Sequence, residues 1–325
     1  MFIDVVRPES WEELNDKVKT SLGLSSKIRA RCFNGINQAV FEISQGTAQF
    51  MSHKKAIGVI QGQTAAFDGL LPYYYKETYE VATLSHTQLD NVKEWVDGLK
   101  KETCFVLFAE DHPVTGELYP FADELDRLLN EKRIFSFKVS HAHHLHTTDE
   151  VRPYSARLCS FDPNTAVAIL GERFRSPSLL AHSQNWDTEA FLKNLVINAS
   201  VDPVVIEHFE KEISTVATPF FNNNPNRLFD RAVCIFNDVS AEALAETIFA
   251  KLQISKEEGY QKILTPNMCH WSVIKMFRHW WDPAPSLEQL RGMLIFTPDV
   301  LHIKDFAKLV ITSYEEIKAE QSWSL

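Results

Sequence analysis

Residues able to do chemistry follow three apolar runs of strand length in this chain. Asp111 comes at the end of CFVLFAED, Ser140 and His141 close IFSFKVSH, and Ser160 ends RLCS. In a parallel α/β sheet, ligand-binding groups gather where the strands end. Carboxylates and imidazoles there could transfer protons, serines could act as nucleophiles, and several of these groups could bind a metal.

A polar turn made of Gly62, Gln63 and Thr64 follows another strand-like run at 56–60 and precedes a helix expected from residue 65. A glycine and a hydroxyl residue at a helix start present free backbone N–H groups, which suit an anion such as a phosphate. An ordinary helix-capping turn explains the same residues equally well. Both interpretations stay open.

Four histidines lie close together in the segment that follows the apolar run IFSFKVS. They are His141, His143, His144 and His146. In an extended segment His141 and His143 share a face, and Asp149 or Glu150 could complete a zinc or iron shell. The spacing matches no strong metal signature, and solvated or hydrogen-bonded histidines are the plain alternative.

A hydrolytic site is a further interpretation of the same region. Ser140 or Ser160 could pair with a histidine, but the chain contains no Gly-x-Ser-x-Gly elbow. The composition therefore allows such a site without indicating one.

The elements that must position these residues alternate between strand and helix. Apolar or alternating runs predict strands at 56–60, 79–85, 104–109 and 134–139, and helical periodicity is found at 34–51, from about 89, and around 121–129. This order implies right-handed crossovers and a mostly parallel sheet with helices on both faces. We expect an α/β large domain.

The pattern changes in the last third of the chain. A loop at 222–226 marks a candidate boundary, and a strand at 232–237, a helix at 241–252, a strand at 292–296 and a terminal helix at 303–320 follow it. We expect two domains. Residues 1–227 would hold an N-terminal segment and the large α/β domain, and 228–325 a small α+β domain.

The composition of the chain indicates which classes of partner to expect. The formal charge of −10 in 325 residues, without a basic cluster, argues against nucleic acid or an anionic membrane as the main partner. No leader-like start and no apolar run of about 20 residues is present, so we expect a cytoplasmic protein. The five cysteines form no C-x-x-C pair, which favours reduced, buried thiols.

Residues 56–176 together resemble the large domain of fold-type I pyridoxal-phosphate (PLP) enzymes, the superfamily of aminotransferases and cysteine desulfurases, and 228–320 more weakly resemble its small domain. The resemblance implies that Gly62, Gln63 and Thr64 hold the cofactor phosphate. His86, after the strand at 79–85, would stack on the pyridine ring. Asp111 would replace the asparagine that contacts the cofactor's phenolate oxygen.

More positions follow from this resemblance. The family strand ending Val-Asp-Glu-Ala-His is similar to residues 139–143, so Ser140 and His143 would face the cofactor. Arg173, after Gly171, resembles the arginine that helps bind the phosphate. Arg291 resembles the small-domain arginine that grips a substrate carboxylate through two contacts.

Two departures from the family bear on catalysis. Ser140 stands where the family has the aspartate that pairs with the protonated pyridine nitrogen, and a neutral serine cannot stabilise that charge. The Schiff-base lysine is expected at Thr165 or Pro163, and neither side chain carries an amine. No lysine occurs from Val139 through Leu192. Lys138 is the nearest candidate, but it precedes the strand end and is expected to point along or away from the site.

These residues predict an aminotransferase-like pseudoenzyme that has lost PLP catalysis, needs no cofactor, and binds a small anionic ligand or a partner protein. One alternative is an active PLP-dependent aminotransferase or lyase that uses a non-aligned lysine. A minor alternative is a metal-dependent enzyme at 141–146. Because sites of the superfamily are built across a two-fold interface, we also expect a homodimer.

Overall fold

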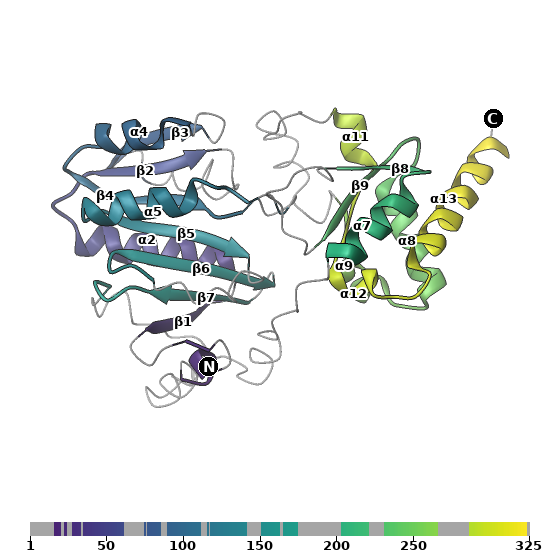
Figure 1. The fold of residues 1–325 in the computed structure, drawn as a ribbon, viewed down its shortest axis with the longest axis horizontal. Coiled ribbons are helices and arrows are strands. Elements are labelled where there is room, and N and C mark those ends of the chain that lie inside the picture. The colour runs from purple at the N-terminus through teal and green to yellow at the C-terminus, as the bar shows by residue number, and fades with distance from the viewer. Residues whose placement is uncertain are drawn as a thin grey trace, which may run out of the picture. The chain divides into compact units, whose positions relative to one another are not determined.

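The protein is described from a computed structural model. The structure describes residues 16–20, 23–24, 28–33, 35–61, 75, 77–85, 90–111, 116, 118–141, 151–162, 165–174, 203–220, 231–265 and 286–323. The chain divides into two compact units, Met1–Asp111 with Tyr119–Ile197, and His112–Leu118 with Asn198–Leu325. We call them the large unit and the small unit (Figure 1).

A seven-stranded sheet forms the centre of the large unit, with strand order β1-β7-β6-β5-β4-β2-β3. The strands are β1 (Arg29–Phe33), β2 (Ala56–Gln61), β3 (Glu80–Ser85), β4 (Thr103–Ala109), β5 (Phe135–His141), β6 (Ser155–Asp162) and β7 (Thr165–Leu170). Strands β3, β2, β4, β5 and β6 pair in parallel, whereas β7 is antiparallel to both β6 and β1. The predicted mostly parallel sheet is confirmed.

Helices cover both faces of this sheet. On one face, α5 (Ala122–Glu131) packs beside α4 (Val92–Gly98), and its Asp126 accepts a hydrogen bond from Ser136 of β5. On the other face lies α2 (Ile36–Phe50), whose Ser44 contacts Tyr75 of the core. All seven residues of β4 are buried, as expected for a central strand covered on both sides.

The small unit contains a four-stranded antiparallel sheet of order β10-β11-β9-β8. Its strands are β8 (Ala217–Pro219), β9 (Ala232–Phe236), β10 (Ile263–Leu264) and β11 (Met293–Phe296). Its helices are α7 (Pro203–Ile213), α8 (Ala241–Leu252), α9 (Lys256–Lys262), α11 (Leu287–Arg291), α12 (Pro298–Leu301) and α13 (Phe306–Trp323). Helix α8 begins at Ser240, whose Oγ accepts a hydrogen bond from Ala243 N.

The small unit begins at Asn198, earlier than the boundary at 227/228 that the sequence suggested. The reason is α7, because its Ile206, Phe209 and Ile213 pack into the same core as Phe236 of β9. The sequence analysis also did not anticipate β1 or the reversed direction of β7. Within the described ranges, no helix is both long enough and apolar enough to span a membrane.

Candidate functional site

The parallel strands bring their last residues to one edge of the large sheet, which we call the carboxyl edge. Glu110 and Asp111 follow β4 there, and Ser140 and His141 end β5. Strand β7 runs the other way and therefore starts at this edge, with Thr165 opposite Asp162 of β6. The carboxyl edge thus gathers groups that lie far apart in the sequence.

Two of the expected cofactor contacts are described in full. Asp111 and Ser140 are both completely buried. Ser140 lies opposite Cys159 of β6, and the two side chains contact each other. Burial raises the pKa of Cys159 to about 12, so the thiol is neutral at pH 7. Ser140 and Cys159 therefore form a neutral pair where the family has a carboxylate.

The position expected for the Schiff-base lysine also belongs to the carboxyl edge. Thr165 starts β7 directly across from Asp162, the last residue of β6, at this edge. The backbone therefore brings this position to the same side of the sheet as Ser140. The residue there is threonine, and its side chain and Pro163 lie outside the described residues.

Arg173 does not join this group. Leu170 pairs with Ala156 at the start of β6, and Arg173 N donates a hydrogen bond to Pro153 O at 3.0 Å. Since β7 is antiparallel, Arg173 lies at the amino edge of the sheet, whereas β2 ends at the carboxyl edge, roughly 20 Å away along the strand direction at about 3.3 Å per residue. The expected grouping of Arg173 with the turn after Gln61 is not formed. Its guanidinium instead lies 5.8 Å from the Tyr154 ring centroid.

Several predicted residues lie outside the described ones. These are Gly62, Gln63, Thr64, His86 and His143, together with the side chain of His141. Strands β2 and β3 end at Gln61 and Ser85, immediately before two of them. Within the described part of the chain, no three His, Cys, Asp or Glu residues are grouped to hold a metal ion.

Comparison with solved structures shows which known fold this chain resembles. No family model and no curated protein matches the sequence. A NifS-like protein from Rickettsia africae is similar with a TM-score of 0.63 at 11% identity, over 96% of this chain and 89% of that chain. A cysteine desulfurase from Thermococcus onnurineus gives 0.64 at 9%, over 96% and 84%. A histidinol-phosphate aminotransferase from Clostridium acetobutylicum gives 0.58 at 13%, over 98% and 92%.

The chain has the fold of the fold-type I PLP-dependent transferases. Identities this low establish the fold and not the activity. If Ser140 takes the position that the resemblance implies, the described edge residues do not fit PLP, because Ser140 and Cys159 form a neutral, buried pair and the ring nitrogen needs a carboxylate. We therefore derive no chemical step through this cofactor.

A buried ion network lies beneath the carboxyl edge of this PLP-transferase fold. Lys138 Nζ is 2.7 Å from Glu110 Oε1, and Arg157 donates to Glu110 Oε2 from Nη2 at 2.8 Å and from Nε at 3.1 Å. The side chains of Lys138, Arg157 and Glu110 are 8%, 7% and 15% exposed. We call these three residues the Glu110 network.

The network shows where the Lys138 side chain lies. Its amine is held beside Glu110, which follows β4, and lies 3.4 Å from Asp123 Oδ1 of α5. The sequence analysis missed the network. Its signal is the placing of charged residues at alternate positions of buried strands, as at Lys138 in FSFKVSH and Arg157 in SARLCSFD.

Electrostatics keep Glu110 ionised. Burial by itself raises the pKa of this carboxyl group, but the charges of Arg157 and Lys138 and their hydrogen bonds outweigh that effect and hold the pKa below its usual value. One carboxylate thus balances two cations inside the fold. This arrangement is a structural feature of the edge that the family resemblance did not imply.

Another helix also starts at the carboxyl edge. Phe33 ends β1 opposite Ala166 of β7, and α2 begins directly afterwards at Gly35. Gly35 has a φ of 90°, a backbone conformation that favours glycine, and as the N-cap residue it has no side chain that could accept from the first-turn N–H groups. The first-turn N–H groups of such a start favour an anion. The Asn34-Gly35 pair in the sequence is the signal for it.

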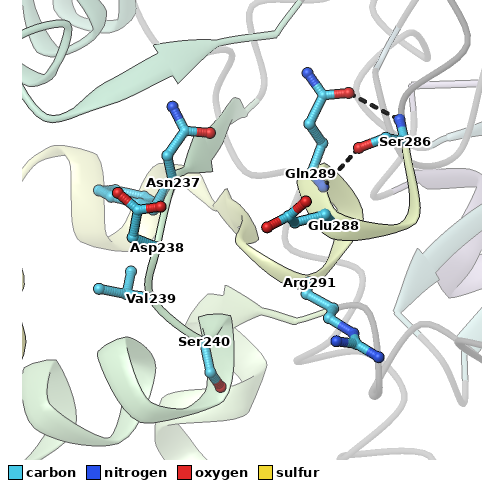
Figure 2. Close-up of a pocket in the computed structure, with 9 residues that line it drawn as sticks. Asn237, Asp238, Val239, Ser240, Ser286, Glu288, Gln289 and Arg291 are labelled. Atoms are coloured by element: carbon cyan, nitrogen blue, oxygen red, sulfur yellow. Dashed lines mark hydrogen bonds between the residues drawn. The ribbon is translucent and has the colours of Figure 1, made fainter. Parts of the chain in front are cut away.

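Arg291 lies in the small unit, on a hollow of about 360 Å³. The hollow is lined by Phe236, Asn237, Asp238, Val239, Ser240, Ser286, Glu288, Gln289 and Arg291. Figure 2 shows the Arg291 side chain extending away from Asp238 and Glu288. Ser286 and Gln289 bond each other in a capping box, and Asp238 pairs with Lys318 at 2.9 Å. The lining side chains are mostly exposed. The carboxylate-binding role of Arg291 remains a prediction.

Proposed function

We propose that this chain is a non-catalytic protein with the PLP-transferase fold, which acts by binding a small anionic ligand or a partner protein. The observation that carries the proposal is the position of Ser140 and the neutral group beside it. This residue ends β5 at the carboxyl edge, is completely buried, and faces the neutral Cys159 thiol. A neutral pair offers nothing to hold a proton on a pyridine nitrogen.

PLP supplies an electron sink, and that sink depends on a protonated ring nitrogen and on a lysine amine that anchors the cofactor. Ser140 removes support for the first requirement. The second requirement is expected at Thr165 or Pro163, and neither side chain carries an amine. Because the two changes affect different parts of the chemistry, each one alone would impair it.

Binding is the role that remains. An anionic ligand is supported by the uncapped start of α2 at the carboxyl edge, where the helix dipole and backbone N–H groups favour negative charge. A protein partner is the second candidate, supported by the exposed Phe41 and Phe50 side chains of α2.

Two enzymatic alternatives compete with this proposal. An active PLP enzyme would need a non-aligned lysine, and the described lysine at the edge, Lys138, is bound to Glu110. A metal-dependent enzyme would use the histidines at 141–146. Those residues lie outside the described ones except for the backbone of His141, so that alternative stays a prediction.

The test is covalent trapping. Purified protein is incubated with PLP, scanned for visible absorbance, reduced with borohydride, and weighed intact by mass spectrometry. We expect no visible band, no mass increment, and no transaminase or desulfurase activity. A fold-type I aminotransferase treated in the same way is the positive control. A stoichiometric adduct on one lysine would establish the active PLP enzyme instead.

A further inference from the structure

Basic residues collect at the amino edge of the large sheet, the edge at which β2, β4, β5 and β6 begin (Figure 1). Strand β1 begins there and β7 ends there, because Arg29 and Leu170 are register partners. Each of these six neighbouring strands has a cation within three residues of this edge. In sheet order they are Arg29 of β1, Arg173 after β7, Arg152 before β6, Arg133 before β5, Lys101 before β4 and Lys55 before β2. Because they come from separate segments, no run of basic residues marks them in the sequence.

Most of this charge is not used inside the fold. Arg152 is the exception, since it pairs with the buried Asp126 at 2.6 Å. The other five side chains are exposed, and we call them the basic edge: Arg29, Lys55, Lys101, Arg133 and Arg173. Among the residues that the structure describes, no carboxylate forms an ion pair with the first four of these. Arg173 Nε lies 3.7 Å from Oε1 of its exposed neighbour Glu172.

Several acidic residues also lie near the amino edge, but most of them are already paired. The pairs are Lys100–Glu80 at 2.5 Å, Arg127–Glu131 at 2.5 Å and Lys132–Asp97 at 2.8 Å. Glu77 and Glu102 remain, together with Glu172 beside Arg173. The amino edge therefore keeps a net positive charge in a chain whose total charge is −10.

A positive charge confined to one edge favours a partner that is acidic and short. Guanidinium groups bind carboxylates through two parallel N–H bonds, and clusters of them recognise acidic segments. Six adjacent strands span about 24 Å at about 4.8 Å per strand, a length that an extended segment of about seven or eight residues covers. A longer polyanion would run onto the remainder of the chain, which is net negative and repels it.

The aromatic rings near the basic edge distinguish an acidic peptide from single-stranded nucleic acid. Proteins that bind single strands present aromatic rings on which the bases stack. Here Lys55 Nζ lies 5.5 Å from the Tyr79 ring centroid, and the Arg173 guanidinium lies 5.8 Å from the Tyr154 ring centroid. Each of these two rings already carries a cation, so neither offers a free face on that side.

We propose that the amino edge of the large sheet is a docking surface for an acidic, extended segment of a partner protein. The inference deepens the proposed function and rests on its protein-partner form, because it names a surface and the chemistry of the partner. The basic edge supplies the charge that attracts the segment. The row of six strand ends sets the length of the segment.

A labelled octa-glutamate peptide tests the docking surface with the intact chain. Fluorescence anisotropy at low ionic strength measures its binding, and octa-glutamine of the same length is the uncharged comparison. We expect octa-glutamate alone to bind, and added salt to weaken the binding because exposed charges are screened. Binding that is equal for the two peptides, or no saturable binding of octa-glutamate, overturns the proposal.

The decisive variant reverses three charges of the basic edge together, as Lys101→Glu, Arg133→Glu and Arg173→Glu. Each exposed ion pair contributes a factor of up to about five, so we expect the triple variant to weaken octa-glutamate binding by about tenfold or more. Circular dichroism checks its fold. Should the triple variant fail to fold, the single variants Lys101→Glu and Arg173→Glu decide the question, with about a threefold loss expected for each.

The matched control reverses three exposed lysines of the small unit, as Lys211→Glu, Lys304→Glu and Lys308→Glu. It has the same net charge as the triple variant of the basic edge and leaves that edge unchanged. We expect octa-glutamate to bind it within about twofold of wild type. Equal losses in the two triple variants would show that net charge and not the amino edge controls binding, and the docking surface would be refuted.

Two further comparisons identify the partner and separate this proposal from the proposed function. A deoxythymidine octamer that binds the basic edge more tightly than octa-glutamate would overturn the assignment to an acidic protein segment. Absence of octa-glutamate binding, with no PLP adduct in the trapping experiment, overturns the docking surface and leaves the non-catalytic proposal standing. A PLP adduct together with edge-dependent peptide binding overturns the non-catalytic proposal and leaves the docking surface.

Discussion

At the scale of single residues, the unusual feature of this protein is a carboxylate shared by two buried cations. Glu110 accepts from Lys138 and from Arg157, and all three side chains are largely withdrawn from water. Removing charges from water costs free energy, which a buried pair recovers only with good geometry. The distances of 2.7 and 2.8 Å meet that condition. Losing the carboxylate would remove the contact that both cations share.

The first prediction concerns stability. Glu110→Gln should lower the free energy of unfolding by about 3 to 5 kcal/mol, the usual effect of breaking a buried ion pair by removing one partner. Urea unfolding followed by circular dichroism measures it. Glu80→Gln is the control, because its pair with Lys100 is exposed and should contribute no more than about 1 kcal/mol. Equal effects of the two substitutions would contradict the importance of the network.

The second prediction concerns pH. Because Arg157 and Lys138 hold the pKa of Glu110 below its unfolded value, the folded state binds this proton less tightly than the unfolded state does. The stabilisation is fully present above the unfolded value of about 4.3 and is lost as the pH falls through the lower folded value. The stability difference between wild type and Glu110→Gln should therefore shrink on acidification. Urea titrations from neutral to acid pH measure it, and a constant difference would refute the linkage.

At the scale of elements, the turn after β7 shows that a motif resembling a binding site can have a packing role. Gly171-Glu172-Arg173 resembles a phosphate-binding motif, yet the structure uses it to close the amino edge. Gly171 N donates to Ser155 O, and a Cβ on Gly171 would lie 2.1 Å from Arg152 O. The glycine is therefore required for a close approach between two segments of backbone.

The third prediction follows from that contact. Gly171→Ala should destabilise the large unit by about 1 to 3 kcal/mol or more, as overpacking does when rigid backbone must move. Gly98→Ala in α4 is the control, because nothing lies within 4 Å of an added Cβ there and alanine should be neutral or stabilising by about 0.5 to 1 kcal/mol. Thermal unfolding compares them. A neutral Gly171→Ala would contradict the close packing.

Elements with a continuous buried side could be predicted from the sequence, and those defined by distant pairing could not. In these elements the local sequence pattern shows which residues are buried. Examples are the helical periodicity of α5 and α8 and the apolar runs of β2 and β4. Strand β1 was missed because two of the first three residues of RARCF are arginines, which masks its apolar character. The direction of β7 depends on its partners β6 and β1, which no local pattern records.

The same limit applies to the candidate site. The sequence located Asp111 and Ser140 correctly at strand ends, since strand ends follow from local pattern. It could not group them with Arg157, which lies 47 positions from its partner Glu110. It misplaced Arg173 because the edge reached by that residue depends on a reversed strand. Residue type and spacing define candidates, and sheet topology decides which of them meet.

At the scale of the whole molecule, the fold is kept at very low sequence identity. The chain matches solved PLP-transferase structures over 96% to 98% of its length at 9% to 13% identity. Packing constraints tolerate such divergence as long as volume and hydrophobic pattern are kept. Catalytic residues do not, because each has a specific role. Our proposal of a role in binding or assembly therefore rests on Ser140 and on the position expected at Thr165 or Pro163, and not on the fold.

The last prediction concerns that assembly. We expect a homodimer of about 74 kDa, twice the 37.2 kDa of one chain, because the resemblance implies a site built across a two-fold axis. The Phe41 and Phe50 side chains of α2 are 39% and 51% exposed in the single chain, so a dimer could bury them. Multi-angle light scattering at micromolar concentration measures the mass.

Phe41→Glu or Phe50→Glu should shift the population towards the monomer, since a buried unpaired carboxylate opposes association. Val204→Glu on α7, where the wild-type side chain is 65% exposed, is the matched control and should leave the mass unchanged. A wild-type mass near 37.2 kDa would contradict the predicted homodimer.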